Sequence, residues 1–429
     1  MSESIAARHV KDTLLGQSKG MRTLTMLTCL MLAAMPSLAA PRLLVIAHRG
    51  ASGERPEHTI EAYRLAIAQG ADFIEPDLVP TRDGILIARH ENSLSGSTNV
   101  ADKPEFAERL TRKQVDGVWV EDWFAEDFSL AEIRQLRARE TKPNERPANV
   151  AFNDQFSIPT FAEVIDLARG ESERLGRPIG LYPETKHPTF FLHEGRRFDG
   201  EPIAQDTSAM LLDDLVASEF TDPKRVFIQS FELANLLQLK RVLMPRSGVA
   251  FPLVFLVGDV SGGTRPEDSN FGQPYDLVWN AQRAAVLPEI YDSLASVVPK
   301  FGAATGYADL MTPEALAALR TDVDALGLWS AAVLGVTPAP NGALDPRPRL
   351  GRLAPWLAEA IALDFGVHVY TVRKEPSFLF VDAQGRVQSA QELIAALADA
   401  GVEGVFADQP GLAAEVRDAR AAAQEPAAH

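Results

Sequence analysis

The chain has 429 residues, 46% of them hydrophobic, and a formal net charge of −16 at pH 7. This length and composition allow one large core and exclude an extensively disordered protein. The negative charge argues against a nucleic-acid partner, because no basic face is available to follow a phosphate backbone. A metal ion beside an arginine or lysine can still invert the local field and hold a small anion.

Residues 1–40 have the pattern of a cleaved export signal. Lys19 and Arg22 precede an apolar stretch, 24–35, which is too short to span a bilayer and is followed by a small-x-small cleavage site. The alternative is a buried helix. The only cysteine, Cys29, lies in this segment, so the mature chain would have no disulfide. We therefore expect a periplasmic or secreted protein without stable membrane insertion.

From residue 41 to residue 412, strand-like apolar runs alternate with helix-like stretches. The strand-like runs are 43–47, 71–74, 85–88, 179–184, 225–229, 249–257, 302–307, 367–372 and 404–407. The helix-like stretches are 59–69, 160–169, 209–219, 232–242, 313–326, 353–365 and 390–400. Such alternation predicts an α/β fold with a parallel sheet, and this number of units suits a closed (β/α)8 TIM barrel.

Residues 92–157 interrupt the alternation after the third strand-like run. The segment is charged, contains Trp119 and Trp123, and is too long for a plain loop. It predicts a small inserted subdomain or a lid. The Ala-rich end, 413–429, is expected to fray.

Ionisable residues follow three of the predicted strands directly. His48 follows the first run, Glu75 and Asp77 follow the second, and His90 follows the third. The carboxyl ends of parallel strands meet at one end of a barrel, which is where such folds carry out chemistry. These side chains are therefore expected to converge.

Glu75 and Asp77 are two residues apart, a spacing that places both on one face of a strand. Two carboxylates on one face repel each other unless a cation lies between them. A divalent metal site completed by Glu184, at another strand end, is the functional interpretation, and three oxygen ligands favour Ca²⁺ or Mg²⁺. The structural alternative is a solvated pair bound to arginines.

His48 and His90 suit proton transfer, because histidine titrates near neutral pH. A single histidine is more often a hydrogen-bonded core residue, but two at strand ends beside carboxylates favour catalysis. Arg49 can bind two oxygens of a phosphate, and Lys186, two residues after Glu184, adds a point charge on the same face. Surface ion pairs are the alternative for these two cations.

Taken in order, these motifs resemble the glycerophosphodiester phosphodiesterase family, most closely its secreted bacterial branch. The resemblance rests on HRGASG at 48–53, PEHT at 56–59, the Glu75–Asp77 pair, the His-Glu-Asn that starts at His90, and the segments 182–186, 229–231, 370–373 and 406–410. It spans roughly residues 43–412. Some relatives have aspartate in place of Glu91, so the sequence does not identify the hydrogen-bond partner that orients His90.

The resemblance implies metal-dependent hydrolysis of glycerophosphodiesters, such as deacylated phospholipids, to glycerol 3-phosphate and an alcohol. It assigns acid/base roles to His48 and His90 and favours one Ca²⁺ ion, with Mg²⁺ as the alternative. Phe231 and Tyr370 are expected to line the glycerol pocket, although simple core packing would also explain them. The partner would be this small-molecule substrate; the sequence gives no oligomeric state.

Three other functions fit the same motifs. A related lipid phosphodiesterase or lyase would stop at a cyclic phosphate; an exposed apolar rim for membrane docking would favour it, and the sequence shows no obvious one. A non-catalytic barrel that binds glycerophosphodiesters would lack a histidine or a metal carboxylate, and all are present here. A hydrolase of glycerol-phosphate polymers would differ only in substrate length.

Overall fold

The structure, a computed structural model, describes residues 42–261, 270–283, 286–341, 343 and 345–424. The expected export signal, 1–40, lies outside the described residues. Within the described part of the chain, no helix is both long and apolar enough to cross a membrane.

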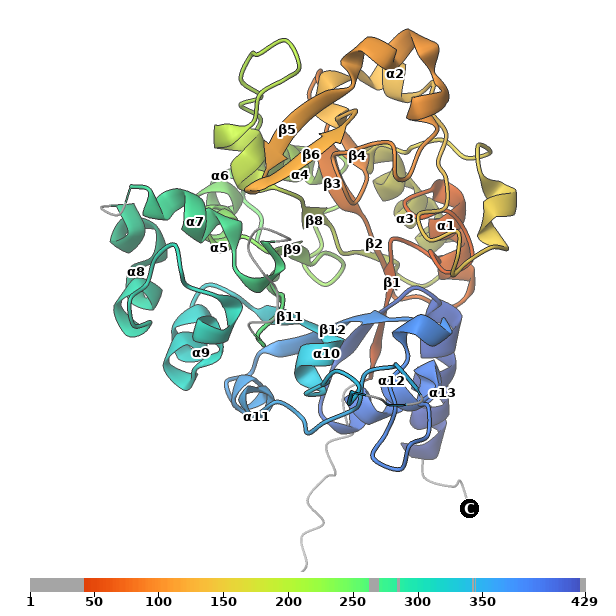
Figure 1. Ribbon diagram of the computed structural model, residues 1–429, viewed down its shortest axis with the longest axis vertical. Helices are drawn as coiled ribbons and strands as arrows, with labels where there is room; N and C mark the ends of the chain where they lie inside the picture. The colour runs from red at the N-terminus through yellow and green to blue at the C-terminus, as the bar shows by residue number, and fades with distance from the viewer. Residues whose placement is uncertain (1–41, 262–269, 284–285, 342, 344, 425–429) are drawn as a thin grey trace, which may run out of the picture. The chain divides into compact units, whose positions relative to one another are not determined.

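Parallel strands form a ring at the centre of the fold (Figure 1). Strand β1 (Leu44–His48) pairs with β13 (Gly404–Ala407) on one side and β2 (Phe73–Glu75) on the other. After Pro76 the chain continues as β3 (Asp77–Pro80), and the facing strand is also split, into β7 (Gly180–Leu181) and β8 (Glu184–Thr185). Because β2 pairs with β7 and β3 with β8, each pair of segments acts as one strand.

The ring continues through four more strands: β9 (Ile228–Ser230), β10 (Leu253–Val257), β11 (Ala325–Trp329) and β12 (Gly366–Val372). Strand β8 pairs with β9, each of the next strands pairs with its successor, and β12 pairs with β13. When each split strand is counted once, the described residues contain eight parallel strands that lead back to β1. The pairing agrees with the predicted α/β barrel.

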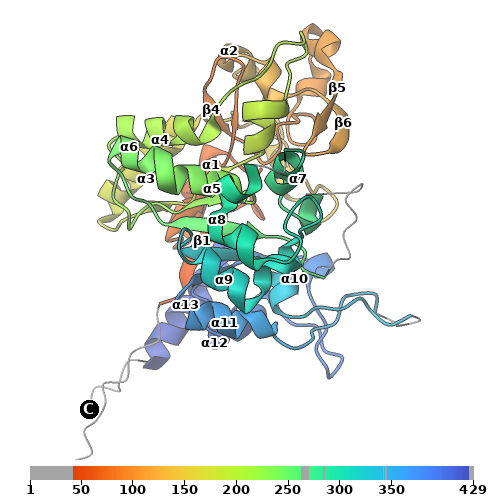
Figure 2. The ribbon, with the colours of Figure 1, turned by 90° about the vertical axis from the view of Figure 1, so that its left-hand side faces the viewer.

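Helices lie outside this ring (Figure 1 and Figure 2). They are α1 (Ile60–Ala68), α2 (Leu130–Ile133), α3 (Phe161–Leu175), α4 (Thr207–Ala217), α5 (Leu233–Gln238), α6 (Met244–Ser247), α7 (Tyr275–Ala281), α8 (Leu287–Val297), α9 (Pro313–Leu319), α10 (Ser330–Val333), α11 (Pro355–Ala362), α12 (Ala390–Asp399) and α13 (Pro410–Gln424). Side-chain caps fix several of their starts. Thr59 accepts a hydrogen bond from the N–H of Ala62 at the start of α1, and Thr160 and Ser389 begin α3 and α12 with capping boxes.

Side chains alternate between the inside and the outside of the barrel. On β1, Val45 and Ala47 belong to the core between strands and helices, whereas Ile46 belongs to the cluster inside the barrel. Successive side chains of a strand point to opposite faces, so His48 shares the inner face with Ile46. The same rule puts Glu75 on the inner face with Phe73. The barrel interior thus changes from apolar to ionisable at its carboxyl end.

The third strand-like run does not belong to the ring. Strand β4 (Leu86–Ala88) runs antiparallel to β3, and the chain turns back between them. The expectation that His90 ends a barrel strand is therefore wrong. His90 instead approaches the carboxyl end of the barrel from above, on a segment that returns toward Asp77, whose carbonyl accepts a hydrogen bond from the N–H of Arg89.

Two other expectations are also wrong. Residues 302–307 form no strand, and the predicted helix 313–326 ends at Leu319, after which β11 begins at Ala325. At the chain end, residues 413–424 do not fray. They belong to α13, where Ala413, Ala414 and Arg417 are buried, and 425–429 lie outside the described residues.

Residues 92–157 contain the hairpin of β5 (Thr111–Val115) and β6 (Val118–Asp122), the short helix α2 and several 3-10 turns. Both views place the hairpin and α2 at the same end of the fold as β4 (Figure 1 and Figure 2). A second apolar cluster holds this region together. It includes Phe106, Phe124 and Phe128, together with Phe190 and Phe191 from outside the segment.

The replacement Phe128→Ala tests this second cluster. The Phe128 ring contacts Phe106 edge-on with 5.0 Å between centroids, and it is fully buried. Losing it should lower the free energy of unfolding by roughly 3–5 kcal/mol, because a cavity remains. Thermal melting measures this. Phe198→Ala, at a ring that is 44% exposed, is the matched control and should cost much less. Equal losses in the two variants would contradict the packing described here.

Candidate active site

A cavity of about 590 Å³ opens at the carboxyl end of the barrel. Its lining includes eight of the nine predicted site residues: His48, Arg49, Glu75, His90, Glu184, Lys186, Phe231 and Tyr370. Asp77 is not in the lining but lies directly beside it, with a carboxylate oxygen close to those of Glu75 and Glu184. The residues predicted to converge therefore do converge.

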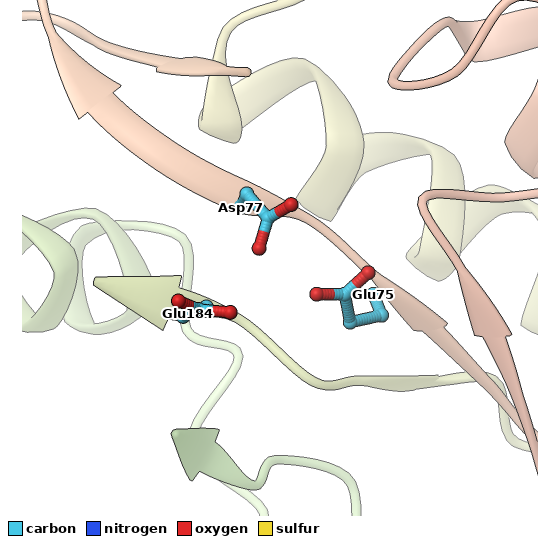
Figure 3. A group of neighbouring side chains, drawn as sticks. All are labelled: Glu75, Asp77 and Glu184. Carbon is cyan, nitrogen blue, oxygen red and sulfur yellow. The ribbon is translucent and has the colours of Figure 1, made fainter. Parts of the chain in front are cut away.

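Glu75, Asp77 and Glu184 point toward one another (Figure 3). One oxygen of each carboxylate lies within 4.8 Å of the others. The three are 2%, 1% and 5% exposed, respectively. Asp77 and Glu184 are direct partners in the pairing of β3 with β8, so strand register itself creates the cluster.

Burial sets the protonation of this trio. Burial and repulsion from Asp77 and Glu184 raise the pKa of Glu75 well above its ordinary value. Burial, partly offset by Lys186, raises the pKa of Glu184 to about 8. For Asp77 burial acts upward, but Lys186 and the hydrogen bond from His58 outweigh it and lower the pKa. Without an added cation, the raised pKa of each glutamate favours its protonated form, which relieves the repulsion.

The donor set fits a hard divalent ion. All three ligands are carboxylates, and Asp77 Oδ1 is buried without a hydrogen-bond partner. The ion-pair alternative is also partly realised, since Lys186 Nζ lies 2.8 Å from Glu184 Oε1 and Arg49 Nε 3.3 Å from Asp77 Oδ2. These two cations do not fully balance the three carboxylates, because the pKa values of both glutamates remain raised.

His48, the last residue of β1, is held by a buried carboxylate. Its Nδ1 donates to Asp408 Oδ1 at 2.6 Å. Burial and the neighbouring charge of Arg49 lower the pKa of His48 to about 3. The ring is therefore neutral near pH 7 and, with its proton on Nδ1, keeps Nε2 as a bare acceptor.

His90 has an equivalent contact with a more exposed partner. Its Nδ1 lies 2.6 Å from Glu91 Oε1, which answers the question of what orients this ring. Burial, Arg49 and Lys186 lower the pKa of His90 to about 4. The other oxygen of Glu91 faces His187, whose Nδ1 is 2.6 Å from Asp116 in the β5–β6 turn. Burial acts to lower the pKa of His187, but Asp116 and Glu91 raise it to about 10.

Arg49 adopts a left-handed backbone conformation. Its φ is +58°, and its N–H donates to Glu75 Oε2 at 2.7 Å while its guanidinium reaches Glu57 and Asp77. Gly50 follows with φ of +84°, and a Cβ there would lie 2.7 Å from the backbone carbon of Ala62. The glycine of this motif is thus needed both for conformation and for space.

Phe231 and Tyr370 form an aromatic wall of the cavity. Their rings meet edge-on with 6.0 Å between centroids, and Lys186 Nζ lies 5.6 Å from the centre of the Phe231 ring. The Tyr370 hydroxyl donates to the carbonyl of Val257 at 2.8 Å. Both residues face the cavity, so core packing alone does not account for them.

Several residues of the site were not predicted. Gln229 donates to Glu75 Oε1 at 3.0 Å, and its place in the Gln-Ser-Phe motif at a strand end was the available signal. His58 bridges Asp77 and the hydroxyl of Tyr63. Arg146, from the 92–157 segment, binds Asp408, and no local pattern marks it.

Comparison with known proteins adds a family match. Residues 48–304 match the model of the glycerophosphoryl diester phosphodiesterase family. The chain is 29% identical over 370 residues to a glycerophosphodiester phosphodiesterase of Arabidopsis thaliana, covering 85% of this chain and 83% of that protein. It is 30% identical over 387 residues to a glycerophosphodiester phosphodiesterase of Haemophilus influenzae, covering 87% of this chain and 89% of that protein.

A solved structure from Silicibacter pomeroyi DSS-3, named provisionally as a glycerophosphoryl diester phosphodiesterase, has a similar fold. The TM-score is 0.51 at 20% sequence identity, with 88% of this chain and 94% of that chain covered. At this identity the similarity supports the fold.

The raised pKa values of Glu75 and Glu184 predict that a divalent ion displaces protons from the carboxylate trio. With its pKa raised to about 8, Glu184 holds a proton near pH 7 in the metal-free protein, and a cation among the three carboxylates would lower this pKa and that of Glu75. Titration with Ca²⁺ should release on the order of one proton per ion, which calorimetry in two buffers of different ionisation enthalpy measures. Glu184→Gln should release fewer. A binding heat that is independent of the buffer would count against the trio as the ligand set.

Proposed function

The chain belongs to the glycerophosphodiester phosphodiesterase family, and we propose that it uses one divalent metal ion and two histidines to hydrolyse glycerophosphodiesters to glycerol 3-phosphate and an alcohol. The enzyme class, a phosphoric diester hydrolase, follows from the family match and the two relatives. The observation that carries the finer proposal is one cavity lined by His48 and His90 beside three clustered carboxylates.

Glu75, Asp77 and Glu184 would hold the metal ion, with Ca²⁺ favoured and Mg²⁺ as the alternative, because only oxygen ligands are offered. When bound, such an ion orients hydroxyl groups and offsets the negative charge that builds up on phosphate oxygens. Arg49 and Lys186 line the same cavity and would bind the phosphate, since, against the effect of burial, neighbouring carboxylates raise the pKa of both and keep them positively charged.

His48 is assigned as the first base. Its Nδ1–H donates to Asp408, so Nε2 is free to take the proton of the glycerol 2-hydroxyl as that oxygen attacks phosphorus. The P–O bond to the head group then breaks, and His90 gives a proton to the departing alcohol. Water opens the resulting cyclic phosphate with the two roles exchanged, which regenerates both histidines.

His90 must be protonated to act as the acid, although its pKa is lowered to about 4. The lowering comes from burial and from Arg49 and Lys186, the two cations that the phosphate would bind. An anionic phosphate between them offsets their charge and raises the pKa of His90. Glu91 stabilises the imidazolium from the other side. Substrate binding thus favours the protonated form that the mechanism needs.

Phe231 and Tyr370 would pack against the carbon chain of glycerol. They form an apolar wall within reach of Lys186, which suits a ligand that is apolar on one face and anionic on the other. For residues 1–40 we propose an export signal that is removed, giving a periplasmic or secreted enzyme. N-terminal sequencing of the exported protein tests this, and a retained residue 1–40 segment would refute it.

The first prediction from this function concerns products and metal. Incubation with glycerophosphocholine should yield glycerol 3-phosphate and choline, and excess chelator should remove activity that Ca²⁺ or Mg²⁺ then restores. Phosphorus NMR identifies the products directly. Accumulation of a cyclic phosphate would indicate the lyase-like alternative, and full activity in chelator after dialysis would refute the metal site.

His48→Ala and His90→Ala should each lower kcat by roughly 100-fold or more, since each removes one proton-transfer step. Steady-state kinetics on glycerophosphocholine measures this. Their combined loss should be much smaller than the product of the single losses, because the two act as one unit. His193→Ala, at an exposed histidine outside the cavity, is the control. Near-normal kcat in either of the first two variants would show that the histidine is structural.

A further inference from the structure

Asp408, the hydrogen-bond partner of His48, also binds two arginines. Its Oδ1 accepts from His48, while its Oδ2 accepts from Arg373 Nε at 2.7 Å and from Arg146 Nη2. Burial acts to raise the pKa of Asp408, but Arg373 and His48 outweigh it and hold the pKa well below its usual range. Asp408 is therefore a carboxylate that only accepts, which fixes the proton of His48 on Nδ1.

Arg146 comes from the 92–157 segment and is held on every side of its guanidinium. Besides Asp408, it donates from Nε to Glu375 Oε1 at 2.6 Å and from Nη1 to the carbonyl of Ser52 at 2.9 Å. The Ser52 hydroxyl in turn donates to the carbonyl of His48 at 2.8 Å. The Arg146 side chain is 3% exposed, so these charge-assisted bonds lie in a low-dielectric interior.

The two arginines on Asp408 have different access to the cavity. Arg373 is part of the cavity lining and can touch a substrate, whereas Arg146 is not among the lining residues. Any effect of Arg146 on the reaction must therefore pass through the groups that it binds. Of these, Asp408 contacts a ring in the cavity, and Ser52 contacts the backbone of the same residue.

We propose that Arg146 is a positioning residue for His48: it fixes the Asp408 carboxylate in place, so that His48 presents Nε2 to the substrate in one orientation. The proposal rests on the proposed role of His48 in hydrolysis. It also gives the 92–157 segment a part in the reaction itself, because this segment supplies a group that the barrel strands do not.

Replacement by methionine keeps the length and apolar stem of Arg146 while removing its charge and donors. Arg146→Met should lower kcat on glycerophosphocholine by about tenfold, less than the loss of an acid/base group itself. KM should change less than about twofold, because the residue does not line the cavity. Arg146→Lys retains the charge but loses the fork of donors, so it should recover part of the activity.

Arg139→Met is the matched control. Arg139 lies in the same segment and binds two carboxylates, Asp102 and Asp154, but its side chain is 31% exposed and, within the described part of the chain, its ion pairs reach no residue of the cavity lining. Its replacement should leave kcat unchanged. Equal losses of kcat in the two variants would overturn the proposal, because the loss would then come from a general disturbance of the 92–157 segment and not from the contact with Asp408.

A double-mutant cycle separates positioning from general structure. If Arg146 acts through His48, adding Arg146→Met to His48→Ala should lower kcat by less than about twofold, against tenfold in the wild-type background. An equal tenfold loss in both backgrounds would overturn the proposal. If Arg146→Met does not fold, by its melting temperature, the cycle is run with Arg146→Lys, whose charge is kept.

Failure of the proposed function gives a different result. Absence of hydrolysis by the wild type, or undiminished hydrolysis by His48→Ala, refutes the function before Arg146 is considered. Normal hydrolysis with a large loss in His48→Ala, but kcat within twofold of wild type in Arg146→Met, refutes only the positioning role.

Discussion

The repulsion among Glu75, Asp77 and Glu184 determines much of what surrounds them. Charges no more than 4.8 Å apart repel by roughly 3.5 kcal/mol per ionised pair at an effective dielectric constant of about 20. Strand register holds the three residues together, so the chain cannot relieve this by moving them apart. It places donors around them instead: the N–H of Arg49 and the amide of Gln229 on Glu75, and Lys186 on Glu184. The raised pKa values of both glutamates show that these donors stop short of full compensation.

The two histidines share one pattern but differ in how firmly it is fixed. Each ring has Nδ1 within 2.6 Å of a carboxylate, which leaves Nε2 for chemistry. Asp408 is 1% exposed and bound by two arginines, whereas the side chain of Glu91 is 52% exposed. An ionised acceptor favours one neutral tautomer of His48, which suits its proposed role as a base. A partner open to water suits the proposed role of His90, which would give up and regain a proton in each cycle.

Local patterns were enough to predict the residues that strand register brings together. His48, Glu75, Asp77 and Glu184 follow apolar runs, and alternation along a strand fixes the face on which each lies. His90 lies in the predicted place, but the parallel strand expected to bring it there is wrong, because an apolar run does not indicate whether a strand pairs parallel or antiparallel. Strand β11 was missed because Ala-Leu-Gly-Leu-Trp has no β-branched residue and continues the apolar pattern of α9.

The contacts that could not be predicted are those between distant parts of the chain. Arg146 meets Asp408 across 262 positions of sequence, and nothing in Asn-Glu-Arg-Pro distinguishes it from a surface arginine. Asp116 is similarly ordinary in sequence, yet it holds His187 beside Glu91. Such pairs depend on how the 92–157 segment packs on the barrel, which the second apolar cluster decides through Phe190 and Phe191.

The barrel and this segment therefore fix different things. Strand register sets where each side chain emerges along the barrel, and this alone is enough to assemble three carboxylates. It does not set the rotation of a ring about its own bonds. That rotation is fixed by the hydrogen bond that each ring makes at Nδ1 with a carboxylate. Residues of the 92–157 segment bind these carboxylates in turn: Arg146 binds Asp408 directly, and Asp116 binds His187, which faces Glu91. A barrel without residues 92–157 would keep the three clustered carboxylates, but Asp408 would lose Arg146 and His187 would lose Asp116.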